Sequence, residues 1–152
     1  MILLWERLKG RDAHLLGREL LARAVGGQLP EIAVTERGKP YFPHDPRHFS
    51  ITHTAHHVFV AVSEKNIGID AEETSRAVKE TTARRLLSPT EWQRYQVSTD
   101  KNAAFLRLWV QKEASAKRSG EGLTHAVNKT DFRPEADCVR LIDGCFVAVL
   151  EE

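Results

Sequence analysis

The sequence of 152 residues predicts an α+β fold that forms one compact unit. A stretch near the N-terminus repeats apolar residues at helical spacing, whereas 58–62 and 67–72 show the apolar runs and period-two alternation of strands. The tetrapeptide Phe-Val-Ala-Val occurs twice, at 59–62 and at 146–149. Chance explains so short a repeat equally well, but a genuine repeat would mean two related α+β halves that divide near residues 73–76.

The first half is predicted to contain one helix followed by strands. Asp12 can cap a helix over 13–25, whose leucines form one apolar face, and Gly26 with Gly27 ends it. Because only the polar stretch 63–66 separates two apolar runs, these runs are expected to pair as a hairpin. Strands are predicted over 29–34, 49–54, 58–63 and 67–72, with a loop or extended segment over the proline-rich stretch 40–46.

The second half is predicted to be rich in helix. Ser88 and Glu91 form a capping box with Pro89 at the first helical position, so a short helix is expected over 89–97. The preceding segment, 76–87, is also expected to be helical. A long helix should run from near residue 101 to residue 120, a glycine, because glycine readily adopts the left-handed conformation that ends helices.

Composition and charge argue against several classes of protein. A net charge of +1 and a pI near 7.9, without a long basic run, make nucleic acid an unexpected partner. The apolar start over residues 1–5 is too short for a signal peptide, and no later segment approaches the length of a membrane span. We therefore expect a cytoplasmic protein with no membrane partner. The two cysteines lie outside any Cys-x-x-Cys pattern and are expected to be reduced thiols.

The long helix carries the most informative motif of the chain, WVQKEASAK at 109–117. Helical spacing puts Phe105, Trp109, Glu113 and Lys117 on one stripe, so a carboxylate and an ammonium continue an aromatic face that should be buried. Charges beside a core are costly unless they are used. On the helix alone, an exposed salt bridge between Glu113 and Lys117 explains the pattern equally well.

A second acidic motif lies far from the first in the sequence, in the predicted strand 67–72. Period-two alternation sends Asp70 and Glu72 to one face of this strand, while Ile67, Ile69 and Ala71 take the other. The two carboxylates could form the solvent face of an edge strand. Alternatively they hold a hard cation, most simply Mg²⁺, which prefers oxygen ligands.

With two upstream segments, these motifs resemble the signature of the 4'-phosphopantetheinyl transferases. The segments are GKPY at 38–41 and FSITHT at 49–54, followed by GIDAE at 68–72 and KEAxxKxxGxGL at 112–123. Their order and spacing are most similar to the two-lobed surfactin-synthetase type of that family. The resemblance implies two pseudo-symmetric α/β lobes, residues 1–74 and 75–152, with the active site between them.

The resemblance also implies an activity, the transfer of 4'-phosphopantetheine from coenzyme A to a serine of an acyl or peptidyl carrier protein, with release of 3',5'-adenosine bisphosphate. It implies that Asp70, Glu72 and Glu113 ligate Mg²⁺. Glu113, or a water that it holds, would accept the serine proton. Lys117 would contact the transferred phosphate, and Lys112 would support the acids or face solvent.

On the donor side, the resemblance places Lys39 and His53 at phosphates of coenzyme A, with Thr52 as a further contact. Taken alone, Lys39 is interpreted as a solvated loop lysine and His53 as a strand histidine that is hydrogen-bonded in the core, because lone residues carry little information about a site. The segment ahead of the first predicted helix is short, and offers the 3'-phosphate only the basic residues Arg7, Lys9 and Arg11.

Other interpretations lead to different functions. A metal site of His53, His56 and His57 is not expected, because no matching histidine or cysteine ligands accompany them. The chain could be a non-catalytic module that binds coenzyme A or a carrier protein, although the three retained acids argue against it. It could also be an interaction domain whose charged helix face is merely solvated.

Carrier proteins are typically acidic, so a basic and apolar segment is a candidate docking surface for the partner. Arg84 and Arg85, followed by Leu86 and Leu87, fit this description, but they fit a solvated helix end equally well. Which carrier protein is modified does not follow from the sequence. Two lobes in one chain would make a monomer sufficient.

Overall fold

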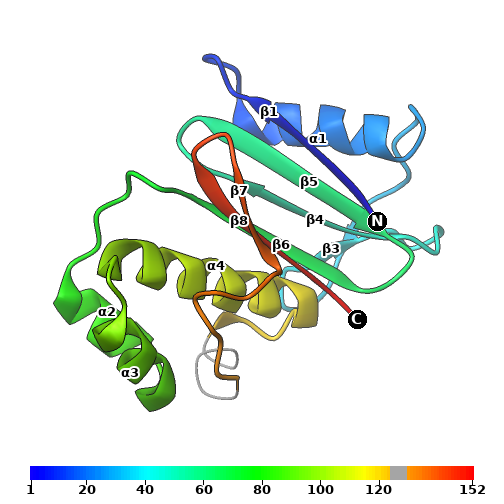
Figure 1. Ribbon diagram of the computed structural model, residues 1–152. Helices are drawn as coiled ribbons and strands as arrows, with labels where there is room; N and C mark the ends of the chain where they lie inside the picture. Colours follow the sequence, from blue (N-terminus) through cyan, green and yellow to red (C-terminus); the bar gives the residue numbers. More distant parts are fainter. Residues whose placement is uncertain (124–129) are drawn as a thin grey trace.

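The computed structural model describes residues 1–123 and 130–152 and confirms an α+β fold (Figure 1). Its elements in chain order are β1 (Ile2–Arg7), α1 (Ala13–Ala24), β2 (Ala33–Val34), β3 (Pro40–Tyr41), β4 (His48–His53), β5 (His57–Ser63), β6 (Ile67–Glu73), α2 (Glu80–Leu86), α3 (Pro89–Val97), α4 (Lys101–Ser119), β7 (Val139–Ile142) and β8 (Cys145–Glu151). The strands form two three-stranded antiparallel sheets, ordered β1-β5-β4 and β6-β8-β7, and a short ribbon of β2 with β3.

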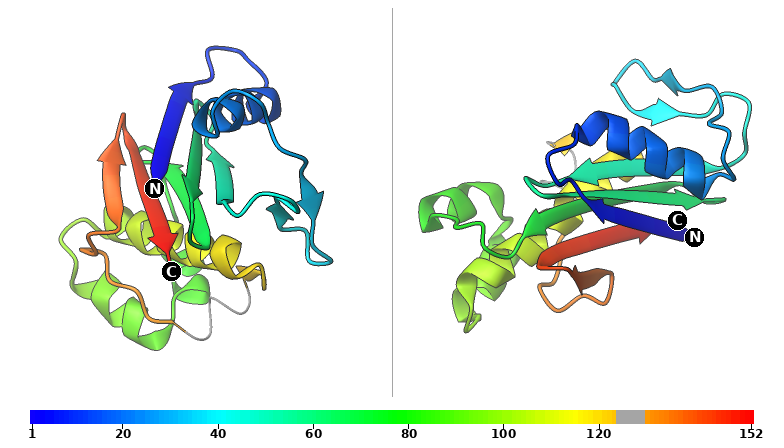
Figure 2. Two further views of the ribbon diagram at one scale, coloured as in Figure 1. Left: turned by 90° about the vertical axis from the view of Figure 1, so that its right-hand side faces the viewer. Right: turned by 90° about the horizontal axis from the view of Figure 1, so that it is seen from above.

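The strand β5 lies at the centre of the first sheet and divides its side chains between two apolar cores. Val58, Val60 and Val62 pack with leucines of α1, whereas Phe59 and Ala61 pack against the second sheet. The helix α4 covers the other face of the second sheet, where it contacts β6 and β8. Figure 2 shows the result, with α1 and α4 on opposite sides of the strands.

The predicted helix ends are confirmed where side chains or glycine define them. Asp12 caps α1 by accepting a hydrogen bond from the backbone N–H of Leu15 at 2.9 Å. Ser88 and Glu91 form the predicted capping box of α3. The long helix α4 ends at Gly120, which has a φ of 72°, the left-handed conformation that stops a helix. Local chemistry was sufficient to locate these ends.

Other predicted elements are shorter in the structure. The strand expected over 29–34 is reduced to β2, and the proline-rich stretch contains the short strand β3. The helix expected over 76–87 begins only at Glu80, and Lys79 at its N-terminus makes no side-chain capping bond. Because no capping residue marks the start of this helix, the sequence prediction overestimated its length.

The predicted hairpin between residues 58–62 and 67–72 is wrong. β6 pairs along its whole length with β8, so that Ile67 lies opposite Glu151 and Glu73 opposite Cys145. β6, which the predicted boundary assigns to the first lobe, is therefore part of the sheet built from the C-terminal strands. The two copies of Phe-Val-Ala-Val occupy equivalent places, since β5 and β8 are each the middle strand of a three-stranded sheet. The division into lobes 1–74 and 75–152 stays a prediction.

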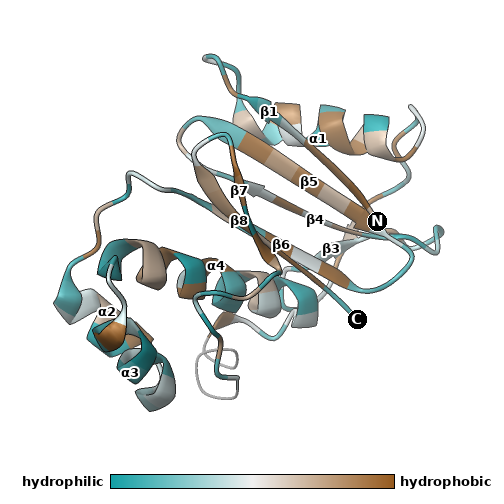
Figure 3. Cartoon of the chain, in the orientation of Figure 1, coloured by the Kyte–Doolittle hydropathy of each residue, from teal (hydrophilic) through white to brown (hydrophobic). Residues whose placement is uncertain are grey.

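The helix α4 lies directly on β6 because residue 68 of that strand is glycine. A Cβ atom at Gly68 would lie 2.0 Å from the carbonyl oxygen of Ala114 and 2.6 Å from the backbone nitrogen of Arg118. The strands between α1 and α4 also carry much of the apolar colour in Figure 3, as expected for elements that are packed between helices. The close approach sets the distance between the acidic residues of β6 and the charged residues of α4.

Among the described residues, no helix combines the length and the apolar character needed to cross a membrane.

Replacing Gly68 by alanine is expected to push α4 away from β6 and to lower the free energy of unfolding by about 2 to 3 kcal/mol, as overpacking does. Gly17→Ala, within helix α1, is the matched control, because its Cβ would meet side-chain atoms and no backbone, those of Ile51 at 3.2 Å and Val58 at 3.7 Å. The control should change stability by less than about 1 kcal/mol. Urea unfolding of both variants measures the difference, and equal stabilities would contradict this account of the contact.

Candidate functional site

The predicted acidic residues lie along the line where the two sheets meet under α4. Ile67, Ile69 and Ala71 pack between the sheets, as the alternation predicts, which turns Asp70 and Glu72 toward α4. The adjacent strand β4 borders β6 here, since the Ser50 hydroxyl accepts a hydrogen bond from the backbone N–H of Ile69 at 3.1 Å. Residues from both sheets and from α4 therefore surround one region.

Asp70 is buried, with 7% of its surface exposed, and Lys117 supplies its charge partner. The Lys117 ammonium donates to Asp70 Oδ1 at 2.7 Å and to Thr52 Oγ1 at 3.1 Å. The Thr52 hydroxyl in turn donates to Asp70 Oδ1 at 3.0 Å. Among the described ion pairs, Lys117 thus binds Asp70 on another element instead of its helical neighbour Glu113. The interpretation as a simple surface salt bridge within α4 loses its basis.

The three acids influence one another electrostatically. Burial raises the pKa of Asp70, with Lys117 opposing the shift. Burial raises the pKa of Glu113, and the charges of Asp70 and Glu72 add to the rise while Lys117 opposes it. Burial also raises the pKa of Glu72, which Arg76 opposes and Asp70 reinforces. Three carboxylates that repel one another at a partly buried place would be relieved by a cation.

These oxygen donors fit a hard divalent cation by their chemistry. As they stand, however, the described residues contain no group of three His, Cys, Asp or Glu side chains close enough to hold a metal ion. The side chain of Lys117 occupies one side of Asp70, and Arg76 forms an ion pair with Glu72. The Lys117 ammonium and the Arg76 guanidinium therefore lie beside two of the carboxylates that the resemblance assigned to Mg²⁺.

A cavity of about 370 Å³ adjoins this cluster. Glu113 and Lys117 line it from α4, and Lys39 lines it from the loop before β3. The remaining lining comes from Arg37, Gly38, Pro40, Phe49, Ser50, Ile51, Ala116, Gly120, Gly122 and Leu123. The structure therefore brings the GKPY, FSITHT and KEAxxKxxGxGL segments to one cavity, although they are distant in sequence.

Lys39 is held at the cavity wall by partners from other elements. Its ammonium donates to Asn66 Oδ1 at 2.7 Å and also to the backbone carbonyl of Arg118. Burial lowers the pKa of Lys39, with the Glu152 carboxylate opposing the shift. The interpretation as a solvated loop lysine does not fit these contacts.

Thr52 and His53 have different surroundings. Thr52 is buried and bonded to Asp70 and Lys117, so it belongs to the acidic cluster. His53 is exposed at the end of β4, and its Nδ1 lies 3.2 Å from the carbonyl oxygen of Thr54. It is not among the residues that line the cavity. The interpretation of His53 as a core histidine is wrong.

Lys112 neither faces solvent nor touches the acids of the site. It is fully buried, and its ammonium donates to Glu91 Oε1 at 2.5 Å, the carboxylate that also completes the capping box of α3. Glu91 Oε2 accepts a further hydrogen bond from the backbone N–H of Phe132 at 3.0 Å. This buried pair fastens α3 to α4 one residue before Glu113. Sequence reasoning missed it, because the capping box suggested only a local role for Glu91.

His56 and His57 form hydrogen bonds with carboxylates, and the described residues show no group of three metal-binding side chains that includes them. His56 contacts Glu73, whereas the buried His57 contacts Asp143 through Nε2 at 2.8 Å and the Cys145 thiol through Nδ1 at 3.5 Å. Both cysteines are free thiols, as predicted. Burial raises the pKa of Cys145 to about 11, so this thiol is not a nucleophile at neutral pH.

Two basic regions named by the sequence differ from expectation. Arg84 and Arg85 are exposed on α2, but Leu87 is buried and Leu86 packs against the same core, so the apolar half of the predicted docking surface is internal. In the N-terminal segment, two of the basic residues expected to meet the 3'-phosphate already have carboxylate partners, because Arg7 pairs with Asp143 and Arg11 with Glu6.

The comparisons with known proteins agree with this geometry. Residues 66–143 match the model of the 4'-phosphopantetheinyl transferase superfamily. A 4'-phosphopantetheinyl transferase of Bacillus subtilis is 34% identical over an alignment that covers 90% of this chain and 68% of the relative. The 4'-phosphopantetheinyl transferase Sfp of Bacillus subtilis strain 168 is 32% identical over 83% of this chain and 61% of its own length. The 4'-phosphopantetheinyl transferase AcpT of Salmonella typhi is 30% identical over 83% and 68%. The chain thus spans 61–68% of the length of these relatives.

Glu113→Gln is expected to stabilise the ligand-free chain at about pH 8 and to change little at about pH 4. Because the folded chain raises the pKa of Glu113 above its ordinary value of 4.5, the wild type gains stability from it at low pH and loses that contribution as the pH rises. Glutamine carries no charge at either pH. Urea unfolding in buffer with a chelator measures the difference, with the exposed Glu64→Gln as control. A variant that is less stable than the wild type at about pH 8 would contradict this account of the acids.

Proposed function

The chain belongs to the 4'-phosphopantetheinyl transferase superfamily, and we propose that it transfers the 4'-phosphopantetheine group of coenzyme A to a serine hydroxyl of an acyl or peptidyl carrier protein. The second product would be 3',5'-adenosine bisphosphate. The resemblance inferred from the sequence motifs, including the surfactin-synthetase type, agrees with the similarity to Sfp.

One observation carries the proposal more than any other. Asp70, Glu113 and Lys117 come from two elements that are far apart in sequence, yet they lie together beside a cavity that Lys39 also lines. Phosphoryl transfer requires the reactants to be held in line and the charge of the phosphate oxygens to be neutralised. An acidic cluster with lysines at the wall of one cavity supports this chemistry.

Glu113 is proposed as the group that accepts the serine proton, directly or through a water. Its raised pKa makes it a stronger base than an ordinary glutamate, and it lines the cavity from which the donor would react. Lys117 would contact the transferred phosphate from the next turn of α4. To do so, its ammonium would exchange the Asp70 carboxylate for a phosphate oxygen in the cavity that Lys117 lines.

Asp70, Glu72 and Glu113 are proposed to hold Mg²⁺. The bound ion would act as a Lewis acid that stabilises the charge on the leaving group. The donor chemistry of the three carboxylates supports this assignment. Their raised pKa values agree with it, since burial raises all three and neighbouring acid charges add to the rise at Glu72 and Glu113. Binding would require Lys117 and Arg76 to give up their present partners.

Lys39, Thr52 and His53 are proposed as contacts of coenzyme A. Lys39 lies at the cavity wall and Thr52 lies beside Lys117, which supports their roles near the phosphates. His53 lies further along β4, beyond the cavity, so it would reach a more distant phosphate of the donor. A module that only binds coenzyme A would need the same basic groups, but it would have no use for the buried Asp70.

The transfer is tested by mass spectrometry of apo carrier proteins of both acyl and peptidyl type, incubated with the chain, coenzyme A and Mg²⁺. A gain of about 340 Da, the mass of the phosphopantetheine moiety, is expected on the carrier. Asp70→Asn should reduce the rate by at least about 100-fold, because the proposed Mg²⁺ ion that neutralises charge in the transition state is held by the Asp70 carboxylate. Glu64→Gln, an exposed glutamate in the turn before β6, should leave the rate unchanged.

Coenzyme A binding without any mass gain on the whole panel of carriers would favour the non-catalytic module. Full activity of Asp70→Asn would refute the assigned site while leaving the family unaffected.

A further inference from the structure

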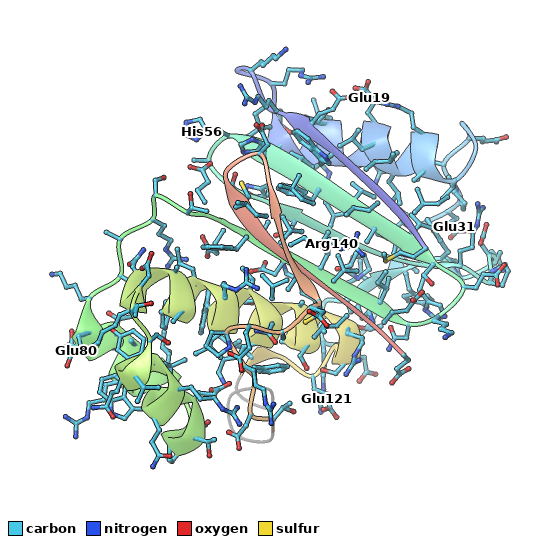
Figure 4. The ribbon with its side chains drawn as sticks, in the orientation of Figure 1. Glu19, Glu31, His56, Glu80, Glu121 and Arg140 are labelled. Atoms are coloured by element: carbon cyan, nitrogen blue, oxygen red, sulfur yellow. The ribbon has the colours of Figure 1, made fainter. Side chains whose placement is uncertain are left out.

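The turn that joins β4 to β5 is folded around a carboxylate from another strand. Glu73, the last residue of β6, accepts a hydrogen bond from the Thr54 hydroxyl at 2.9 Å and another from the backbone N–H of His56 at 3.0 Å. The same oxygen, Oε1, lies 2.8 Å from His56 Nδ1. Figure 4 shows His56 at the end of the molecule where the β7–β8 turn also lies.

The Thr54 hydroxyl organises the rest of this turn. Its oxygen accepts hydrogen bonds from the backbone N–H groups of His56 at 3.2 Å and of His57 at 3.0 Å. Because the hydroxyl donates its one proton to Glu73, its oxygen is oriented to accept from these two groups. Without the Glu73 carboxylate, the hydroxyl would lose the acceptor that orients it and the backbone N–H of His56 would lose one of its two acceptors.

His53 lies at the start of the same turn. Its Nδ1 lies 3.2 Å from the backbone carbonyl of Thr54, so the position of the ring depends on the orientation of that peptide group. Glu73 itself does not line the cavity. Burial would raise the pKa of Glu73, but hydrogen bonds from Thr54 and His56 outweigh it and hold the pKa below its ordinary value, so the carboxylate stays ionised.

The alternation of β6 gives Glu72 and Glu73 opposite directions. Glu72 turns to the acidic cluster under α4, whereas Glu73 turns to the β4–β5 turn. The end of β6 therefore carries two acids with different contacts. Glu72 belongs to the proposed reaction centre, and Glu73 accepts hydrogen bonds from the turn that follows His53. Since β6 is paired with β8 up to Glu73, this strand end is fixed by the second sheet.

We propose that Glu73 is a positioning residue for the donor, which fixes the β4–β5 turn so that His53 meets a phosphate of coenzyme A. The proposal rests on the proposed function, in which His53 contacts that phosphate. Glu73 acts through Thr54 and does not touch the donor. Nothing in the sequence motifs singles it out, because it follows the Asp-x-Glu motif and its partner is in a different sheet.

The test is calorimetric titration of coenzyme A into the wild type, Glu73→Ala, His53→Ala and the double variant, with Glu64→Ala as the control for the loss of one exposed carboxylate. Glu73→Ala should raise the Kd for coenzyme A by about tenfold, the scale of a lost charged hydrogen bond. In the His53→Ala background the same change should have no further effect, because Glu73 acts through His53. Glu73→Gln keeps an oxygen acceptor and should recover most of the affinity.

Thr54→Val is the second route to the same result, since it removes the hydroxyl and leaves the Glu73 charge in place. It should raise the Kd in the wild-type background and not in His53→Ala. Thermal unfolding followed by circular dichroism checks that each variant is folded. An unchanged Kd in folded Glu73→Ala overturns the proposal, as does an effect that multiplies with that of His53→Ala. Because binding is measured without a carrier protein, a wild type that binds coenzyme A but transfers nothing refutes the proposed activity alone.

Discussion

The ion pair between Asp70 and Lys117 is the interaction on which the arrangement of the site depends. A buried carboxylate is stable only with a partner, and here the partner comes from a helix that lies directly on the strand. That closeness requires glycine at position 68, two residues before the acid and on the same face of β6. A structural feature without chemistry of its own, the absence of a Cβ atom, therefore fixes the distance between the acids of β6 and the charged groups of α4.

The same interaction links the two sheets. Thr52 belongs to the first sheet, Asp70 to the second, and Lys117 to the helix that covers the second. Two further contacts join the two sheets, the pairing of Asp143 with Arg7 and His57 and the contact of Glu73 with the β4–β5 turn. On the other side of the site, the buried pair of Lys112 with Glu91 fixes α4 to α3 beside Glu113. The candidate site is assembled from both sheets, and an ion pair or a charged hydrogen bond holds it on each side.

Much of the local structure could be predicted from the sequence, because Asp12, Ser88 and Gly120 act through their immediate neighbours. Periodicity also predicted that Asp70 and Glu72 share one face of their strand and that Glu113 and Lys117 share one face of their helix, whereas only the family resemblance placed the two pairs in one site. The partner of β6 could not be predicted, because its pairing with β8 joins residues that are about 80 positions apart and a nearer apolar run fits equally well. For the same reason the roles of Gly68, Lys112 and Glu73 were not predicted, since each depends on what lies against it in the fold.

The central claim is that Asp70 and Glu113 contribute to one divalent cation site once the donor is bound. Electron paramagnetic resonance of Mn²⁺, titrated into the chain in the presence of coenzyme A, tests this most directly. The account predicts a single bound ion in the wild type, and loss of that ion in both Asp70→Asn and Glu113→Gln. Unchanged stoichiometry and affinity in the two variants would show that these carboxylates do not share an ion, and would contradict the account.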